Sequence, residues 1–123
     1  MIKKINITAV TGFVEQQSDR DNNRFVFAYT ITIENVSDEP FQLVSRHWVI
    51  QDANRKVEEV YGEGVVGQQP IIKPGEKYSY SSGAVLETEM GTMEGRYFML
   101  SEKDDEFEVS IPKFVLTVPR VLH

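Results

Sequence analysis

The chain has 123 residues and a formal net charge of −6 at neutral pH. This length is typical of one domain, so we expect a single domain spanning residues 1–123. The 41% hydrophobic and 26% charged residues are values of a folded globular protein rather than a disordered one. The negative charge disfavours nucleic acid as a partner, because no dense basic patch offsets it. The absence of cysteine excludes disulfides, thiolate metal sites and cysteine nucleophiles.

The first ten residues, MIKKINITAV, alternate polar and apolar side chains. A signal peptide would instead contain an unbroken apolar stretch, so we interpret this segment as the first strand of a cytoplasmic protein. No segment approaches the roughly 20 apolar residues that cross a bilayer, and we expect no membrane partner.

Period-two alternation dominates the rest of the chain. Residues 24–34 place Phe25, Phe27, Tyr29, Ile31 and Ile33 on one face, which predicts a half-buried antiparallel strand with an aromatic core face. A second long strand is expected at 41–51, where Val44, Trp48 and Ile50 share a face. Further strands are expected at 56–61, 77–81, 92–100 and 106–118, separated by turns rich in Asp, Asn, Pro and Gly, and residues 87–90 form one helical turn at most. Together these elements predict an all-β protein, an antiparallel fibronectin-III/Ig-like sandwich of about seven strands.

Three glycines, Gly62, Gly64 and Gly67, have the spacing GxGxxG. In dinucleotide-binding folds this spacing leads into a helix whose amides contact a pyrophosphate, but the residues that follow here contain two prolines and a glycine and predict no helix. Two interpretations stay open. The glycines either turn their amides toward an anion as a nest, aided by Arg55 and Lys56 and by Lys73 and Arg96 if these converge, or only permit tight backbone geometry in a sandwich.

Strict alternation places Arg46 on the same face as Trp48, which conflicts with a dry core. We expect either a bulge that turns Arg46 away or an ion pair with a carboxylate at the edge of the core. His47 then points to the opposite face from Trp48, where it is exposed or lines a groove. No serine or carboxylate at a recognisable spacing makes it a catalytic base, so no catalytic residue is predicted.

Acidic residues gather at 104–108 and at Glu87 and Glu89, but they lack the ligand spacing of a calcium loop. We therefore predict a solvated acidic turn, with no metal site and no cofactor. Most of the aromatic residues Trp48, Tyr78, Tyr80, Tyr97 and Phe98 are expected to pack the sandwich, and Gly95 to permit a close backbone approach.

An ordered series of short segments carries a family resemblance: HW, GEGVVG, PGE, SG, LET, GTM-x-G-x-Y-x-M and a terminal LH. Through this series the chain resembles the bacterial ApaG family almost from end to end. The resemblance implies a fibronectin-III-like sandwich without an established catalytic activity. It also implies a gene neighbourhood shared with diadenosine tetraphosphate hydrolysis and a phenotypic link to cobalt and magnesium tolerance. Similar domains in eukaryotic F-box proteins resemble protein-interaction modules.

The sequence therefore predicts a non-enzymatic binding module whose partner is an unidentified protein or a second copy of the chain. Strand edges and loops would supply its contact surface. The alternative is a small-anion sensor that binds pyrophosphate or the phosphates of a nucleotide at Gly62, Gly64 and Gly67. A metal-assisted phosphohydrolase is a third hypothesis, for which no catalytic set is recognisable.

Overall fold

The structure is a computed structural model, and it describes residues 4–119. Eight strands and two single 3₁₀ turns make up this part of the chain. They are β1 (Ile5–Phe13), η1 (Glu15–Gln17), η2 (Arg20–Asn22), β2 (Phe25–Asn35), β3 (Phe41–Asp52), β4 (Val57–Glu63), β5 (Ile71–Ile72), β6 (Lys77–Leu86), β7 (Met90–Ser101) and β8 (Glu106–Thr117).

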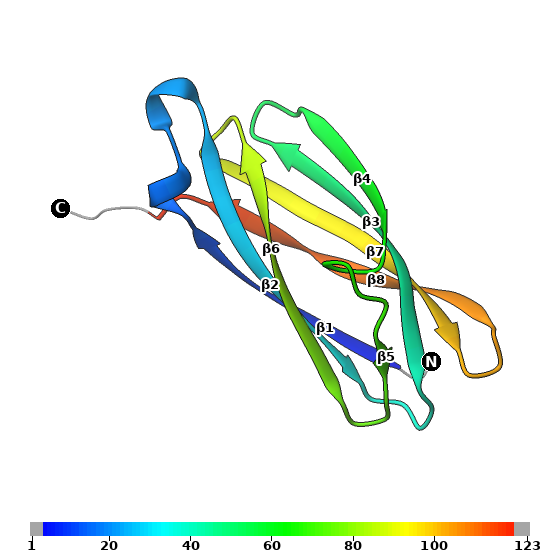
Figure 1. Cartoon of the computed structure of the whole chain (residues 1–123). Helices are drawn as coiled ribbons and strands as arrows, with labels where there is room; N and C mark the ends of the chain where they lie inside the picture. Colours follow the sequence, from blue (N-terminus) through cyan, green and yellow to red (C-terminus); the bar gives the residue numbers. More distant parts are fainter. Residues whose placement is uncertain (1–3, 120–123) are drawn as a thin grey trace.

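Two antiparallel sheets face each other. One has the strand order β1-β2-β6; the other has the order β4-β3-β7-β8, with the short β5 paired to the start of β3. One side of the sandwich is closed where β1 lies beside β8, whereas β6 and β4 border the opposite side, with the loop that leads to β5 between them (Figure 1). The predicted all-β antiparallel sandwich is confirmed, with β5 as the strand that the sequence pattern did not predict.

The predicted core face of β2 is confirmed. Phe25, Phe27, Tyr29, Ile31 and Ile33 are all buried, and so is Trp48 of the facing sheet. Burial of these aromatic and branched side chains between the sheets is the main source of stability in a sandwich of this size.

Val26 was expected on the open face of β2, yet it is also buried. Its backbone N–H donates to the Ser18 hydroxyl and its carbonyl accepts from Val14. The segment with the two 3₁₀ turns therefore covers this end of the sheet, a local fold that period-two alternation does not reveal.

A β-bulge at Val44 interrupts β3. The pairing of β3 with β7 shifts between Leu43 and Ser45, so the alternation of inner and outer side chains changes phase there. Phe41 and Leu43 are consequently buried on the core face, and the prediction that Val44 shares a regular face with Trp48 is corrected. Because the bulge precedes Arg46, this arginine stays on the face of Trp48.

Other boundaries differ modestly from the predicted ones. β6 continues to Leu86 rather than ending at Ser81, and residues 87–89 form a bend rather than a helical turn. Residues 1–3 of the predicted first strand and the terminal residues 120–123 lie outside the described part. Between residues 4 and 119, no helix has the length and apolar character needed to cross a membrane.

Candidate functional site

The loop after β4 forms a small hairpin in which several amides already have carbonyl partners, in the loop itself or in β3. The Gly64 N–H donates to the Val44 carbonyl at 2.7 Å, and Val65 and Gln68 exchange two bonds, at 2.8 and 3.0 Å. The two residues between them, Val66 and Gly67, have φ angles of 48° and 76°. Positive φ at both central residues is the pattern of a type I′ turn.

Each of the three glycines has a separate structural reason. Gly64 has a φ of 61°, and a Cβ there would lie 2.1 Å from the Gln68 carbonyl oxygen. Gly67 needs only the positive φ of the turn, because no heavy atom lies within 4 Å of its Cβ position. Gly62 lies against the Arg46 guanidinium, whose carbon and two terminal nitrogens are each 2.8 Å from the Cβ position. Gly62 therefore leaves room for Arg46.

Arg46 is held by backbone carbonyls rather than by a carboxylate. Its Nη1 donates to the Glu63 carbonyl at 3.1 Å and to the Gly64 carbonyl at 2.6 Å. None of the ion pairs formed within residues 4–119 involves Arg46. The expected ion pair at the edge of the core is thus wrong for the described residues, and so is the expected bulge that turns Arg46 away. The hydrogen-bond partners of the guanidinium within the described residues are therefore neutral carbonyls.

A cleft opens on the side of the sandwich between β3, β4 and β6. Arg46, Trp48 and Val60 line it from one sheet, Tyr80 and residues 81–83 line it from the other, and Val66 of the hairpin also contributes. We call this the Arg46 cleft. It brings one charged group, several aromatic and aliphatic side chains and two serines together.

Two tyrosines of the core lie next to this cleft. The hydroxyls of Tyr80 and Tyr97 are hydrogen-bonded to each other. Burial raises the pKa of both phenols well above the ordinary tyrosine value, and the positive charge of Arg46 partly opposes that rise. Both tyrosines therefore stay neutral at physiological pH.

Trp48 lines the same cleft and is only 2% exposed. Its indole Nε1 is the single buried side-chain polar atom without a hydrogen-bond partner among the described residues.

Val66 has a local conformational cost. Its side chain is 62% exposed, and it adopts a left-handed backbone conformation that β-branched residues rarely occupy. A residue of this kind costs on the order of 1–3 kcal/mol and persists mainly where function requires it. The strained valine lies at the rim of the cleft.

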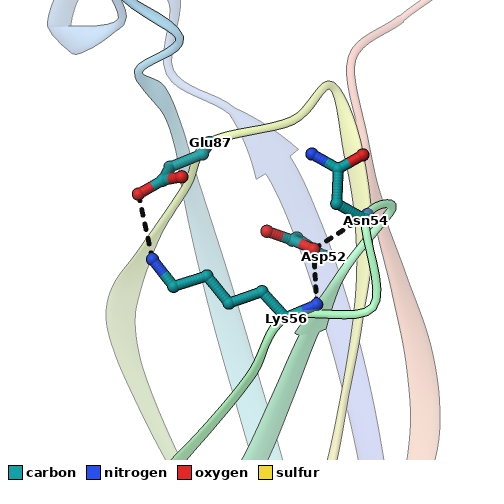
Figure 2. Close-up of polar contacts among 4 residues, drawn as sticks. All are labelled: Asp52, Asn54, Lys56 and Glu87. Carbon is teal, nitrogen blue, oxygen red and sulfur yellow. Dashed lines mark hydrogen bonds and ion pairs between the residues drawn. The ribbon is translucent and has the colours of Figure 1, made fainter.

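Arg55 and Lys56 do not lie near the glycine loop. They belong to the turn before β4, so the whole length of that strand separates them from Gly64 and Gly67. In this turn the Asp52 carboxylate accepts from the backbone N–H groups of Asn54 and Lys56, both at 2.9 Å, while Lys56 Nζ contacts Glu87 at 3.0 Å (Figure 2). That hydrogen bond to Glu87 raises the pKa of Lys56. Lys56 thus bridges the two sheets.

A separate polar group covers the outer face of β3. The His47 ring stacks on Tyr61 with centroids 4.1 Å apart, and its Nε2 lies 3.1 Å from Glu59. Arg96 also lies on this face and pairs with Glu108 at 3.2 Å. His47 therefore faces away from Trp48 as expected, but its neighbours bury it. Arg96 is on the wrong side of the sheet to approach the glycine loop from the cleft.

Several other predicted features have clear positions. A Cβ at Gly95 would lie 2.1 Å from the His47 carbonyl oxygen, which confirms the close backbone approach. Phe98 differs from the other aromatic residues, because it lies on the outer face under Arg96 rather than in the core. Across residues 4–119, no three acidic or histidine side chains are grouped closely enough to hold a metal ion.

The alternation of the sequence marks Arg46 as a misfit on a core face but does not mark it as a candidate site residue. The sequence contains two residues that together indicate the site: an arginine on a core face, and a glycine that leaves space opposite this arginine. The pairing of Arg46 with Gly62 depends on the register of β3 against β4, which the sequence pattern does not give.

Comparison with known proteins is consistent with this architecture. The ApaG domain family matches residues 15–101. Protein ApaG of Thiobacillus denitrificans is 55% identical over 120 residues, which cover 98% of this chain and 94% of that protein. Protein ApaG of Pseudomonas syringae pv. tomato is 51% identical, with 98% and 95% coverage. A crystal structure of an ApaA protein from Bordetella pertussis has a TM-score of 0.92 and 44% identity, covering 95% of both chains. The chain belongs to the ApaG domain family.

Proposed function

We propose that this chain is a fibronectin-III-like, non-enzymatic cytoplasmic binding module. Its partner is a protein that contributes an extended segment, and this segment pairs with the free edge of β6 by strand addition. The observation that supports the proposal is the chemistry of this edge.

The free edge of β6 presents a regular row of backbone groups. In an antiparallel strand, successive residues direct their N–H and C=O groups to opposite sides. Asn35 of β2 exchanges backbone bonds with Glu76 and Gly75, so the odd-numbered residues of β2 face β6. By the register of the two strands, the even-numbered residues of β6 bond to β2. The residues whose backbone groups turn to the free edge are Ser79, Ser81, Gly83 and Val85.

This edge lacks the usual protection against strand addition. Between Tyr78 and Leu86 it contains no charged residue and no proline, and its pairing with β2 has no bulge. The edge strand β4 differs, since it carries three glutamates, and β1 is flanked by β8. An uncharged, regular edge beside a cleft is the arrangement that β-augmentation requires.

The small-anion sensor at Gly62, Gly64 and Gly67 remains a prediction that the geometry favours less. The amides of Gly64, Val65 and Gln68 already have carbonyl partners, and Arg55 and Lys56 lie at the far end of β4. Calorimetry with pyrophosphate or ATP at low salt tests it, and we expect no binding at the loop.

The interaction proposal is tested with two matched proline substitutions. Val85→Pro removes an N–H from the free edge of β6 without removing a bond to β2, and Thr11→Pro removes an outward N–H from β1 on the opposite side of the same sheet. The chain and both variants are used to capture partners from cells that express it. We expect a specific partner that is lost with Val85→Pro and retained with Thr11→Pro. A partner retained by both variants, or lost with both, refutes binding along β6.

A further inference from the structure

We infer that the Arg46 cleft recognises an acidic side chain of the segment that pairs with β6. This inference rests on the proposed function and adds the chemistry of the ligand. It follows from the state of the Arg46 guanidinium, from the cleft that Arg46 shares with the edge of β6, and from the composition of β6 itself.

The guanidinium is positioned but not neutralised. Its Nη1 is fixed by the carbonyls of Glu63 and Gly64, whereas no hydrogen bond from Nε or Nη2 is formed within the described residues. These nitrogens are donors in a rigid fork that matches the two oxygens of a carboxylate. Because the backbone of Gly62 supports one face of the guanidinium, the side chain is oriented before any ligand arrives. Such preorganisation lowers the entropic cost of binding.

Arg46 shares its cleft with the free edge of β6. Residues 81–83 of β6 line the same cleft as Arg46, and two of them, Ser81 and Gly83, turn their backbone groups to the free edge. Successive side chains of an added strand point alternately to the outer face and to the inside of the sandwich. Its inward side chains therefore enter the Arg46 cleft.

The walls of the cleft strengthen a charged contact. Trp48, Val60 and the exposed, strained Val66 give the cleft that holds Arg46 a largely apolar wall. An inward side chain that fills this space excludes water, and a charge-assisted hydrogen bond gains strength in a lower dielectric. In the added segment, an acidic residue would pair with the guanidinium, and apolar neighbours would contact the apolar wall of the cleft.

A second copy of the chain does not supply this ligand by pairing its own β6. The stretch from Tyr78 to Leu86 contains no carboxylate, so two β6 edges paired antiparallel would leave Arg46 without a counter-charge. By its charge, the occupant that matches the cleft is an extended acidic segment, which we assign to another protein.

The test is selection from a displayed library of random seven-residue peptides. The baits are the wild-type chain, Arg46→Met, Arg46→Lys, Arg96→Met and the edge variant Val85→Pro. Arg96→Met is the matched control, because this substitution removes the same charge from the opposite face of the same sheet. Since Arg46 also holds the loop, circular dichroism and thermal unfolding establish that each bait is folded. Arg46→Lys keeps the charge but loses the fork.

We expect wild type and Arg96→Met to select peptides with Asp or Glu at one fixed position. Arg46→Lys should show this preference more weakly, and Arg46→Met should lose it. Replacement of that acidic residue by its amide in a synthetic peptide should weaken binding to wild type about tenfold or more.

The outcomes separate the two proposals. The selected peptides could bind wild type but not Val85→Pro and yet show no preference for Asp or Glu. This result would overturn the inference and leave the proposed function in place. Selection of no peptide, or only of peptides insensitive to Val85→Pro, overturns both. Binding of pyrophosphate alone to wild type but not to Arg46→Met identifies a small-anion site and also overturns the inference.

Discussion

Replacement of Val66 by asparagine should stabilise the protein. Val66 occupies the first central position of the type I′ turn with a φ of 48°. A left-handed conformation costs an ordinary L-residue about 1–2 kcal/mol, whereas asparagine tolerates it and Asn-Gly is the favoured sequence of this turn. The substitution loses some apolar burial. Because the side chain is 62% exposed, the loss is about a third of the 1.5–3 kcal/mol for a fully buried valine, or about 0.5–1 kcal/mol.

The expected net gain is about 0.5–1 kcal/mol, which corresponds to roughly 2–4 °C in melting temperature for a domain of this size. Urea unfolding should show a higher midpoint with an unchanged m-value. Val57→Asn is the matched control, since Val57 is 53% exposed but lies in an ordinary strand. There the same change should destabilise the protein through lost β-propensity. If Val66→Asn destabilises the protein as much as Val57→Asn, the backbone strain assigned to Val66 is wrong.

Three further predictions concern the core and the loop. Trp48→Ala should cost about 3–5 kcal/mol in urea unfolding, because it removes a buried aromatic ring and leaves a cavity; an unchanged midpoint would refute the core assignment. Burial raises the folded-state pKa of Tyr80 and Tyr97, so their contribution to stability is complete below about pH 10, the unfolded value, and is lost as pH rises further. A phenolate absorbance titration should show these two ionising only with unfolding, and ionisation of all five tyrosines in the folded protein would contradict this. Gly67→Ala should cost about 1–2 kcal/mol through its positive φ alone. Gly64→Ala should cost more, because its Cβ also meets the Gln68 carbonyl; equal midpoints would exclude that close approach.

The sandwich could be predicted because its main signals are local. Five alternating apolar residues of β2 identified a strand and its core face, and turn residues marked most boundaries. The signals failed where distant segments act on a strand. Val26 is buried by the segment of 3₁₀ turns, and the bulge at Val44 changes the phase of β3. Neither effect is encoded in the alternation of the strand itself.

The site could be predicted only in part, because it depends on register and on chain direction. The spacing of Gly62, Gly64 and Gly67 correctly indicated unusual backbone geometry but did not show that the loop amides are already paired. Arg55 and Lys56 are close to these glycines in sequence, yet they lie at the opposite end of β4. Arg46 is distant in sequence and lies directly against Gly62.

The three glycines of the GxGxxG spacing shape the surroundings of one arginine, Arg46. Gly62 leaves space for the guanidinium, and Gly64 brings its carbonyl within 2.6 Å of Arg46 Nη1. Gly67 permits the tight turn that places Val66 at the rim of the same cleft. A phosphate-binding loop with this spacing directs its amide donors toward an anion. Here the loop instead directs two carbonyl acceptors, those of Glu63 and Gly64, toward the Arg46 guanidinium, a cation.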